Sequence, residues 1–172
     1  KSDHLEMSEL VRLIDAASAE SPTSHALICL LGLCGLRSGE CSELQVDDFE
    51  ARADGSARLR IGSRNGGEGL SIELGRHTAR ACREAIGGRT SGPLLPGHDG
   101  ARIQPAAMRR TLQRLAKAAN VTSEAITTQA LRRTYFAAAR ASGVPEHDIA
   151  ASMGFRSRAM LEYYGVDRSS VP

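Results

Sequence analysis

The chain has 172 residues, of which 41% are hydrophobic and 24% charged, and this fits a single globular domain with a sizeable core. It contains no apolar run of membrane-spanning length and no signal-peptide pattern, so we expect a cytoplasmic protein without membrane contact. Aromatic residues make up only 3% and tryptophan is absent, which predicts a mainly aliphatic core. Because the chain begins at Lys1 and not at methionine, we expect a further N-terminal portion before it.

The charged residues are distributed unevenly along the chain. Residues 1–100 contain 11 basic and 15 acidic side chains, a balance of −4, whereas residues 101–172 contain 11 basic and 5 acidic side chains, a balance of +6. Such an asymmetry is typical of a protein with one side that faces a polyanion. From charge alone, a solvated basic face is an equally good interpretation.

Four cysteines lie in the first half of the chain, at positions 29, 34, 41 and 82. None forms a CxxC pair, and a zinc site would need closer pairs and matched histidines. We therefore expect free, buried thiols that behave as small hydrophobic side chains in a reducing compartment, and no metal.

Three helices are predicted in the first 44 residues. Apolar residues at helical spacing indicate a helix over 8–18, with Ser8 as its cap. Pro22 fits the first turn of a second helix, which is apolar on all sides and should be the buried central one, ending near Leu36. A short third helix is expected over 38–44.

Two strands follow, over 57–61 and 70–74, since apolar and polar residues alternate in both. The glycine-rich segment 62–69 joins them as a hairpin loop, and Asp54-Gly55 is a turn signal before the first strand. The two strands should pair in antiparallel fashion.

The second half of the chain is predicted to be helical, with Thr127 or Thr128 as a cap and Gly143 as a stop. The expected helices cover 76–86, 105–119, 127–142, 145–153 and 157–164. No repeat or inner boundary divides the chain, so we predict one mainly helical domain over 1–172 with a small antiparallel sheet.

Arg37 lies in the string Gly-Leu-Arg-Ser-Gly-Glu, directly after the predicted central helix. A guanidinium is suited to stabilising a phosphate because its planar fork donates to two oxygens and stays protonated. Glu40, three residues later, can hold that guanidinium. The alternative is an ordinary surface ion pair, worth less than about 1 kcal/mol.

Gln129 and Arg132 are three residues apart and should share one face of a helix, from which both can reach one phosphate. Arg133 and Arg140 would lie to the side, near neighbouring phosphates. A solvated helix with ordinary arginines explains this string equally well.

Tyr164 is the candidate nucleophile. A phenol with a pKa near about 10 needs a positive surrounding to attack as a phenolate, and two arginines would provide it. Tyr163 is the second choice. Taken without the arginines, an aromatic side chain that anchors the last helix is the better interpretation.

These strings resemble the catalytic domain of the tyrosine recombinase (phage integrase) family, and the resemblance covers nearly the whole chain. Arg37 and Glu40 match its G-L-R-x-G/S-E motif, and residues 131–134 match the end of H-x-L-R-H/R-T/S. Residues 153–157 stand where the family has L-G-H-S-S, and the family tyrosine nine residues beyond that histidine corresponds to Tyr164.

Three positions differ from the family pattern. Gln129 and Phe155 replace histidines, and Arg64 is the basic residue nearest to a lysine expected on the hairpin loop. Gln129 can donate a hydrogen bond but cannot move a proton at neutral pH, and Phe155 can only pack. Loss of a positioned acid or base typically slows a reaction by about 10²–10⁴.

The resemblance implies a bacterial or phage-encoded enzyme, associated with DNA, that cleaves and rejoins double-stranded DNA. The tyrosine would form a 3′-phosphotyrosine and release a 5′-hydroxyl, without metal or nucleotide cofactor. It implies a tetramer on DNA, a monomer in isolation, and a separate N-terminal DNA-binding domain. Four arginines are candidates for contacts to the DNA backbone: Arg109, Arg110, Arg133 and Arg156.

Two alternatives remain open at the level of sequence. One is a relative that still binds DNA but cleaves it weakly or not at all. The other is a helical regulatory or interaction domain outside the family, whose basic half is only a solvated face.

Overall fold

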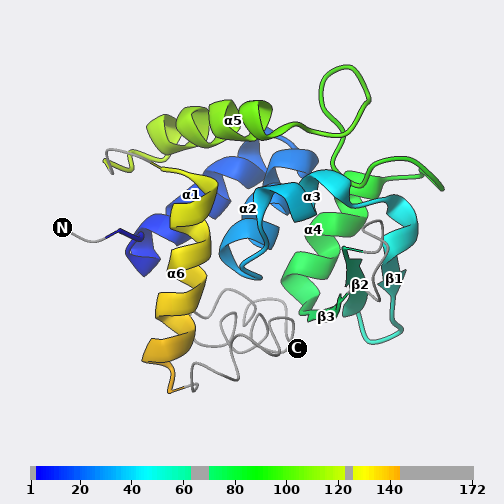
Figure 1. The fold of residues 1–172 in the computed structure, drawn as a ribbon, viewed down its shortest axis with the longest axis horizontal. Coiled ribbons are helices and arrows are strands. Elements are labelled where there is room, and N and C mark those ends of the chain that lie inside the picture. Colours follow the sequence, from blue (N-terminus) through cyan, green and yellow to red (C-terminus); the bar gives the residue numbers. More distant parts are fainter. Residues whose placement is uncertain (1–2, 63–69, 123–125, 144–172) are drawn as a thin grey trace.

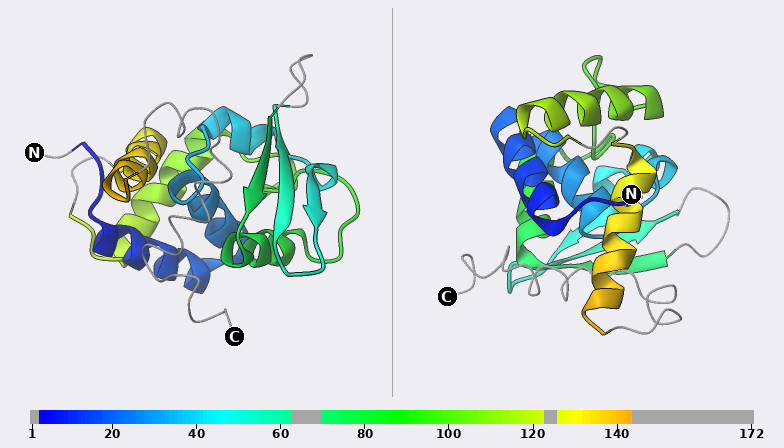
Figure 2. Two further views of the ribbon diagram at one scale, coloured as in Figure 1. Left: turned by 90° about the horizontal axis from the view of Figure 1, so that it is seen from below. Right: turned by 90° about the vertical axis from the view of Figure 1, so that its left-hand side faces the viewer.

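The structure is a computed structural model that describes residues 3–62, 70–122 and 126–143. These residues form a mainly helical domain with a small sheet at one end (Figures 1 and 2). The helices lie on one side of this sheet (Figure 2). Among the described helices, none is long and apolar enough to span a bilayer.

The central element is α2 (Pro22–Gly32), as the sequence predicts. Every residue from Ser24 to Gly32 in this helix is buried, because α1 (Met7–Glu20), α4 (Arg76–Ile86) and α6 (Thr128–Ala141) pack around it (Figure 1). A helix that is apolar on all sides is stable only in such a position. The other helices are thus arranged around α2.

The helix ends are set by local hydrogen bonds. The cap of α1 is Glu6 and not Ser8, as the Glu6 N–H donates to the Glu9 carboxylate at 2.9 Å. For α2, Ser21 Oγ accepts from the Ser24 N–H at 3.0 Å, and Pro22 occupies the first turn.

The C-terminal end of α2 differs from the prediction, because the helix stops at Gly32 and does not continue to Leu36. Gly35 has a φ of +72°, a region that favours glycine, and this turn lets the Leu36 N–H donate to the Leu30 carbonyl at 3.1 Å. The short helix α3 (Ser38–Glu43) follows at once.

The sheet has three antiparallel strands in the order β1-β2-β3. The predicted strands β2 (Ala57–Ile61) and β3 (Leu70–Leu74) have the expected bounds and pair with Leu59 opposite Ile72. β1 (Phe49–Ala51) was not predicted, since it has only three residues after the single-turn 3-10 helix η1 (Val46–Asp48). The predicted hairpin loop over 63–69 lies outside the described residues.

The later helices begin where the sequence places them. They are α4, α5 (Pro105–Ala118) and α6, and Thr127 caps α6 by accepting from the Ala130 N–H at 3.0 Å. The helices predicted over 145–153 and 157–164 lie beyond the described part of the chain.

The core is aliphatic, as the composition predicts, with Tyr135 on α6 as the one fully buried aromatic side chain among the described residues. All four cysteines are free and buried, again as predicted. Burial raises the pKa of the Cys29, Cys41 and Cys82 thiols, which favours their protonated form in the absence of a bound cation.

Leu30→Ala should lower the free energy of unfolding by about 2–5 kcal/mol, because Leu30 is fully buried at the centre of α2 and the deletion leaves a cavity. Urea unfolding measures the loss. The matched control is Leu70→Ala in β3, where the side chain is 42% exposed and the change should stay below about 1 kcal/mol. Equal losses in the two variants would contradict a core centred on α2.

Candidate active site

The turn that follows α2 lies against α6, although nearly one hundred residues separate them in the sequence (Figure 1). Arg132, on the first turns of α6, donates a hydrogen bond through Nη1 to the Gly35 carbonyl oxygen. This contact brings Arg132 next to the segment that carries Arg37.

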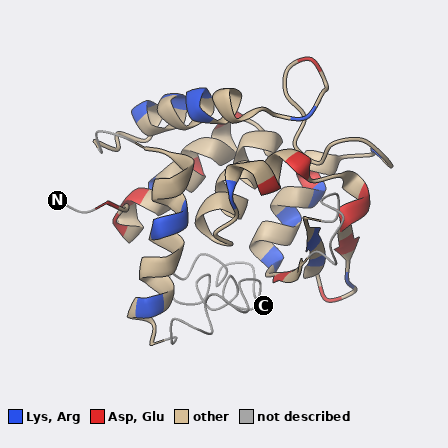
Figure 3. Cartoon of the chain, viewed as in Figure 1, with Lys and Arg blue, Asp and Glu red and all other residues tan. Residues whose placement is uncertain are grey.

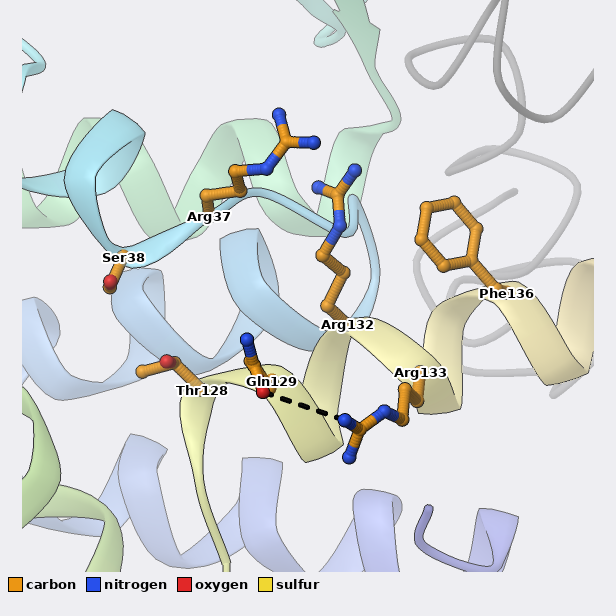
Figure 4. A pocket seen from close by; sticks show the side chains of 7 residues that line it. All are labelled: Arg37, Ser38, Thr128, Gln129, Arg132, Arg133 and Phe136. Carbon is orange, nitrogen blue, oxygen red and sulfur yellow. Dashed lines mark hydrogen bonds between the residues drawn. The ribbon is translucent and has the colours of Figure 1, made fainter. Parts of the chain in front are cut away.

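Between these two segments is a pocket of about 410 Å³. Figure 4 shows that the guanidinium groups of Arg37 and Arg132 point in the same direction from opposite sides of the pocket, one from the loop and one from the helix. Among the described residues that line it, none is acidic: Arg37, Ser38, Thr128, Gln129, Arg132, Arg133 and Phe136. The pocket is therefore suited to an anion.

The backbone of Arg37 is fixed while its side chain remains accessible. The Arg37 N–H donates to Glu40 Oε1 at 2.7 Å, and Arg37 Nη1 lies 3.8 Å from Glu40 Oε2. The spacing predicted a contact between these two residues, but the tighter bond is to the backbone. Since the Arg37 side chain is 68% exposed, the long ion pair adds little stability and leaves the guanidinium able to bind a ligand.

Arg132 is half-buried and more constrained. Its guanidinium carbon lies 4.8 Å from the centre of the Phe136 ring, within the range of a cation–π interaction. Burial lowers the pKa of Arg132, and the nearby Arg37 charge lowers it further while Glu40 opposes the shift. Arginine remains protonated despite such shifts, so the site holds a desolvated cation.

The role of Phe136 was not predicted from the sequence. The available signal was its spacing, because residues four apart on a helix lie on the same face and Phe136 comes four residues after Arg132. Ser38 and Thr128 were likewise not singled out, and both line the pocket.

Gln129 is exposed at the rim of the pocket. Its Oε1 accepts a hydrogen bond of 3.5 Å from Arg133 Nη2, which leaves the amide NH₂ directed toward the Arg37 side of the pocket (Figure 4). Arg133 points away from Arg132, and its Nε lies 3.6 Å from an Asp3 carboxylate oxygen. Gln129 therefore presents a donor to the pocket.

The start of α6 is held by a buried hydroxyl. Thr134 Oγ1 accepts a hydrogen bond of 2.9 Å from the Leu5 N–H and donates one of 2.7 Å to the Ala130 carbonyl. Thr134 is 1% exposed, so the Leu5 N–H would lack a partner without its hydroxyl, whereas the Ala130 carbonyl belongs to the hydrogen-bond ladder of α6. These bonds tie the N-terminal segment to the helix that carries Arg132.

Other predicted site residues do not line this pocket. Arg109 and Arg110 are exposed on α5, and Arg110 borders a separate hollow beside the bidentate Arg114–Glu20 ion pair. The sequence also predicts Arg64, Phe155, Arg156, Tyr163 and Tyr164 as site positions, and all five lie outside the described residues.

The described part of the basic half carries charge of one sign. Residues 101–122 and 126–143 contain eight Lys or Arg and no Asp or Glu, and all but Arg102 lie on α5 and α6 (Figure 3). Acidic side chains lie around η1 and β1, at the other end of the domain, but also in the N-terminal segment and α1, where Asp3 pairs with Arg133 and Glu20 with Arg114. The charge asymmetry of the sequence is thus only partly an asymmetry in space.

The family model of the phage integrase family matches residues 3–169. The chain belongs to the phage integrase family. Its members are tyrosine recombinases, so the family that the three motifs resemble is confirmed, and an interaction domain from outside the family is excluded. No curated protein matches the chain.

Solved recombinase structures have the same fold as this integrase-family domain. XerA recombinase matches with a TM-score of 0.74 and 21% identity, over 98% of this chain and 65% of that chain. XerH recombinase in a pre-cleavage complex with its difH substrate matches at 0.67 and 20% identity, over 89% and 46%. The catalytic core of lambda integrase matches at 0.56 and 20% identity, over 76% and 82%.

These similarities confirm the predicted fold class, a mainly helical domain with a small antiparallel sheet. The integrase-family chain spans less than two thirds of the length of the XerA and XerH chains.

Thr134→Val should leave the Leu5 N–H unpaired and lower the free energy of unfolding by about 1–3 kcal/mol, although the shape of the side chain is preserved. Hydrogen exchange followed by NMR should show loss of protection at the Leu5 amide. Thr134→Ser keeps the hydroxyl and should keep that protection. An unchanged Leu5 exchange rate in Thr134→Val would show that this bond does not hold α6.

Proposed function

We propose that this domain breaks and rejoins DNA as a site-specific recombinase, through a covalent bond between Tyr164 and a DNA 3′-phosphate. The observation that carries the proposal is the convergence of Arg37 and Arg132 on one pocket with no acidic side chain among its described lining residues. Their family motifs and the order Arg37, Arg132, Tyr164 along the chain add support.

The pocket would hold the phosphate that is cut. Arg132 already donates one of its five N–H groups to Gly35, and the remaining groups and those of Arg37 can bind the non-bridging oxygens. The Gln129 amide would add a neutral donor. Because the Arg132 guanidinium and the Arg37 backbone are held in place before DNA binds, the two cations would stabilise the additional negative charge of the transition state with little reorganisation.

In the chemical step, the Tyr164 oxygen attacks phosphorus and loses its proton, and the bond from phosphorus to the 5′-oxygen of the next nucleotide breaks. The leaving oxygen takes up a proton and becomes a 5′-hydroxyl. Attack of a second strand's 5′-hydroxyl on the phosphotyrosine reverses these events and restores the phenol. Since the covalent intermediate conserves the energy of the bond, the sequence of steps requires no nucleotide, and we propose no metal for it.

A second function, DNA binding with weak or no cleavage, is favoured by one observation. Gln129 stands where the family has a histidine, lies at the rim of the pocket and bonds to Arg133 through its oxygen. An amide cannot take up or release the proton that an imidazole would. With Phe155 and Arg64 at two further family positions, proton transfer would be slow even though the anion site is intact.

The proposed partner is double-stranded DNA. Among the structural relatives, XerH was solved with its difH substrate and lambda integrase as a dimer on a COC′ core site. For this chain we propose four protomers on two duplexes, a monomer in isolation, and phosphate contacts from Arg109, Arg110, Arg133 and Arg156. Such contacts would make the affinity fall steeply with salt.

Tyr164→Phe should abolish a covalent protein–DNA adduct that the unchanged protein forms. The substrate is a library of duplexes with random sequence and a nick beside each candidate phosphate, so that a short fragment diffuses away and traps the intermediate. Adducts are counted on a denaturing gel and sequenced. Tyr163→Phe is the matched control and should keep the adduct.

Adduct formation by Tyr164→Phe but not by Tyr163→Phe would contradict the assignment of the nucleophile. Salt-sensitive DNA binding without any adduct in the unchanged protein would support the second function and sink the first.

Arg132→Ala should slow adduct formation by about 10²–10³, because one fixed donor to the transition state is lost. Quenched-flow or manual time courses at saturating DNA measure this rate. Arg80→Ala, an exposed arginine on α4 that does not line the pocket, is the control and should leave the rate within about a factor of two. Equal losses of rate in the two variants would show that adduct formation depends on the total positive charge of the domain and not on Arg132 in the pocket.

A further inference from the structure

A second group of reactive side chains lies between α2 and α4, away from the arginine pocket. His25 and Cys29 are four residues apart on α2 and therefore share one face, and His77 approaches that face from the first turn of α4. One imidazole nitrogen of each histidine and the Cys29 Sγ all lie within 4.8 Å of one another. The proposed strand-cleavage reaction uses none of these three residues.

The geometry points to a zinc site formed by His25, Cys29 and His77 that clamps α2 to α4. Two imidazoles and one thiolate are a ligand set that Zn²⁺ binds, with a fourth position for water or another donor. We infer this site from the distances, burial and partners of these side chains, and it does not depend on the recombinase activity.

The distance between the two imidazoles fits a shared ion. Their Nε2 atoms are 3.3 Å apart, and two nitrogens bound to one tetrahedral zinc at about 2.0–2.1 Å would be about 3.3–3.4 Å apart. The rings stand nearly perpendicular, at 80°, so both lone pairs can converge on one point. The sulfur lies within 4.8 Å of an imidazole nitrogen of each histidine, so it would have to approach them by at most about 1 Å to reach a zinc–sulfur distance of about 2.3 Å.

Among the described residues, the Thr78 hydroxyl lacks a hydrogen-bond partner, and the proposed zinc site would provide one. Thr78, next to His77, is fully buried, and within the described part of the chain its Oγ1 has no hydrogen-bond partner of good geometry. It lies beside Cys29. A zinc-bound Cys29 thiolate would accept a hydrogen bond from the Thr78 hydroxyl. Metal ligands usually have such a hydrogen-bond partner outside the coordination sphere.

The competing interpretation is a pair of neutral histidines that share one proton between their Nε2 atoms. That pair would satisfy both rings without an ion, but it does not explain why Cys29 and the buried Thr78 hydroxyl lie beside it. The sequence disfavoured zinc because no two cysteines form a close pair, whereas the H-x₃-C spacing on α2 supplies a mixed pair instead. His77 is only partly buried, which gives an ion a way in.

The test is a titration of the reduced, chelator-treated protein with Co²⁺, followed by displacement with Zn²⁺. We expect one equivalent of Co²⁺ to produce a thiolate-to-cobalt charge-transfer band and intense tetrahedral visible bands, which Zn²⁺ abolishes. Free Zn²⁺ at about a hundred times its Kd should raise the Tm by about 5–10 °C.

Variants locate the ion. Cys29→Ala should lose the charge-transfer band, and His77→Gln should weaken Zn²⁺ affinity by at least about 100-fold and remove the Tm shift. Cys41→Ala and the exposed His98→Gln are the matched controls and should bind Zn²⁺ like the unchanged protein.

Absence of the cobalt bands in the unchanged protein would establish the proton-sharing histidine pair and overturn the proposal. Binding that survives both Cys29→Ala and His77→Gln would place the ion elsewhere and overturn it as well. If Cys29→Ala does not fold, His77→Gln decides, since its side chain is only partly buried. Loss of zinc binding leaves the Tyr164 adduct assay unaffected, so the two proposals fail separately.

Discussion

The hydrogen bond from Arg132 to the Gly35 carbonyl is the contact on which the geometry of the arginine pocket depends. Gly35 can present this carbonyl because its φ of +72° turns the chain sharply after the buried helix α2. The same turn sends the chain on to Arg37. Gly35 therefore sets the position of Arg37 and accepts the hydrogen bond from Arg132. The spacing between the two guanidinium groups thus follows from how α2 and α6 pack.

Two cations in one pocket repel each other, and the protein offsets this only in part. The Glu40 carboxylate lies near Arg37, but its shorter hydrogen bond is to the Arg37 backbone N–H and not to the guanidinium. Arg132 is half-buried and stacks against the Phe136 ring. A bound oxyanion would remove the repulsion. A phosphate bound between the two arginines would therefore gain free energy from the relief of this repulsion, which the packing of α2 and α6 maintains.

Local patterns predicted most of the fold, and distant contacts account for what they missed. The bounds of β2 and α4 follow from alternation and helical spacing alone, whereas β1 is short and forms only because β2 lies beside it. The motif arginines could be named from the sequence. The convergence of these arginines and the approach of His77 to α2 depend on tertiary packing. The periodicity of apolar residues within one helix or strand does not predict such contacts.

The buried thiols have a practical consequence for anyone who handles this protein. Cys41 and Cys82 are fully enclosed and hold their protons, so a thiol reagent cannot modify them while the domain is closed. Modification therefore requires opening of the core. The rate of labelling at these positions measures how often the helices around α2 separate, and it requires no introduced cysteine.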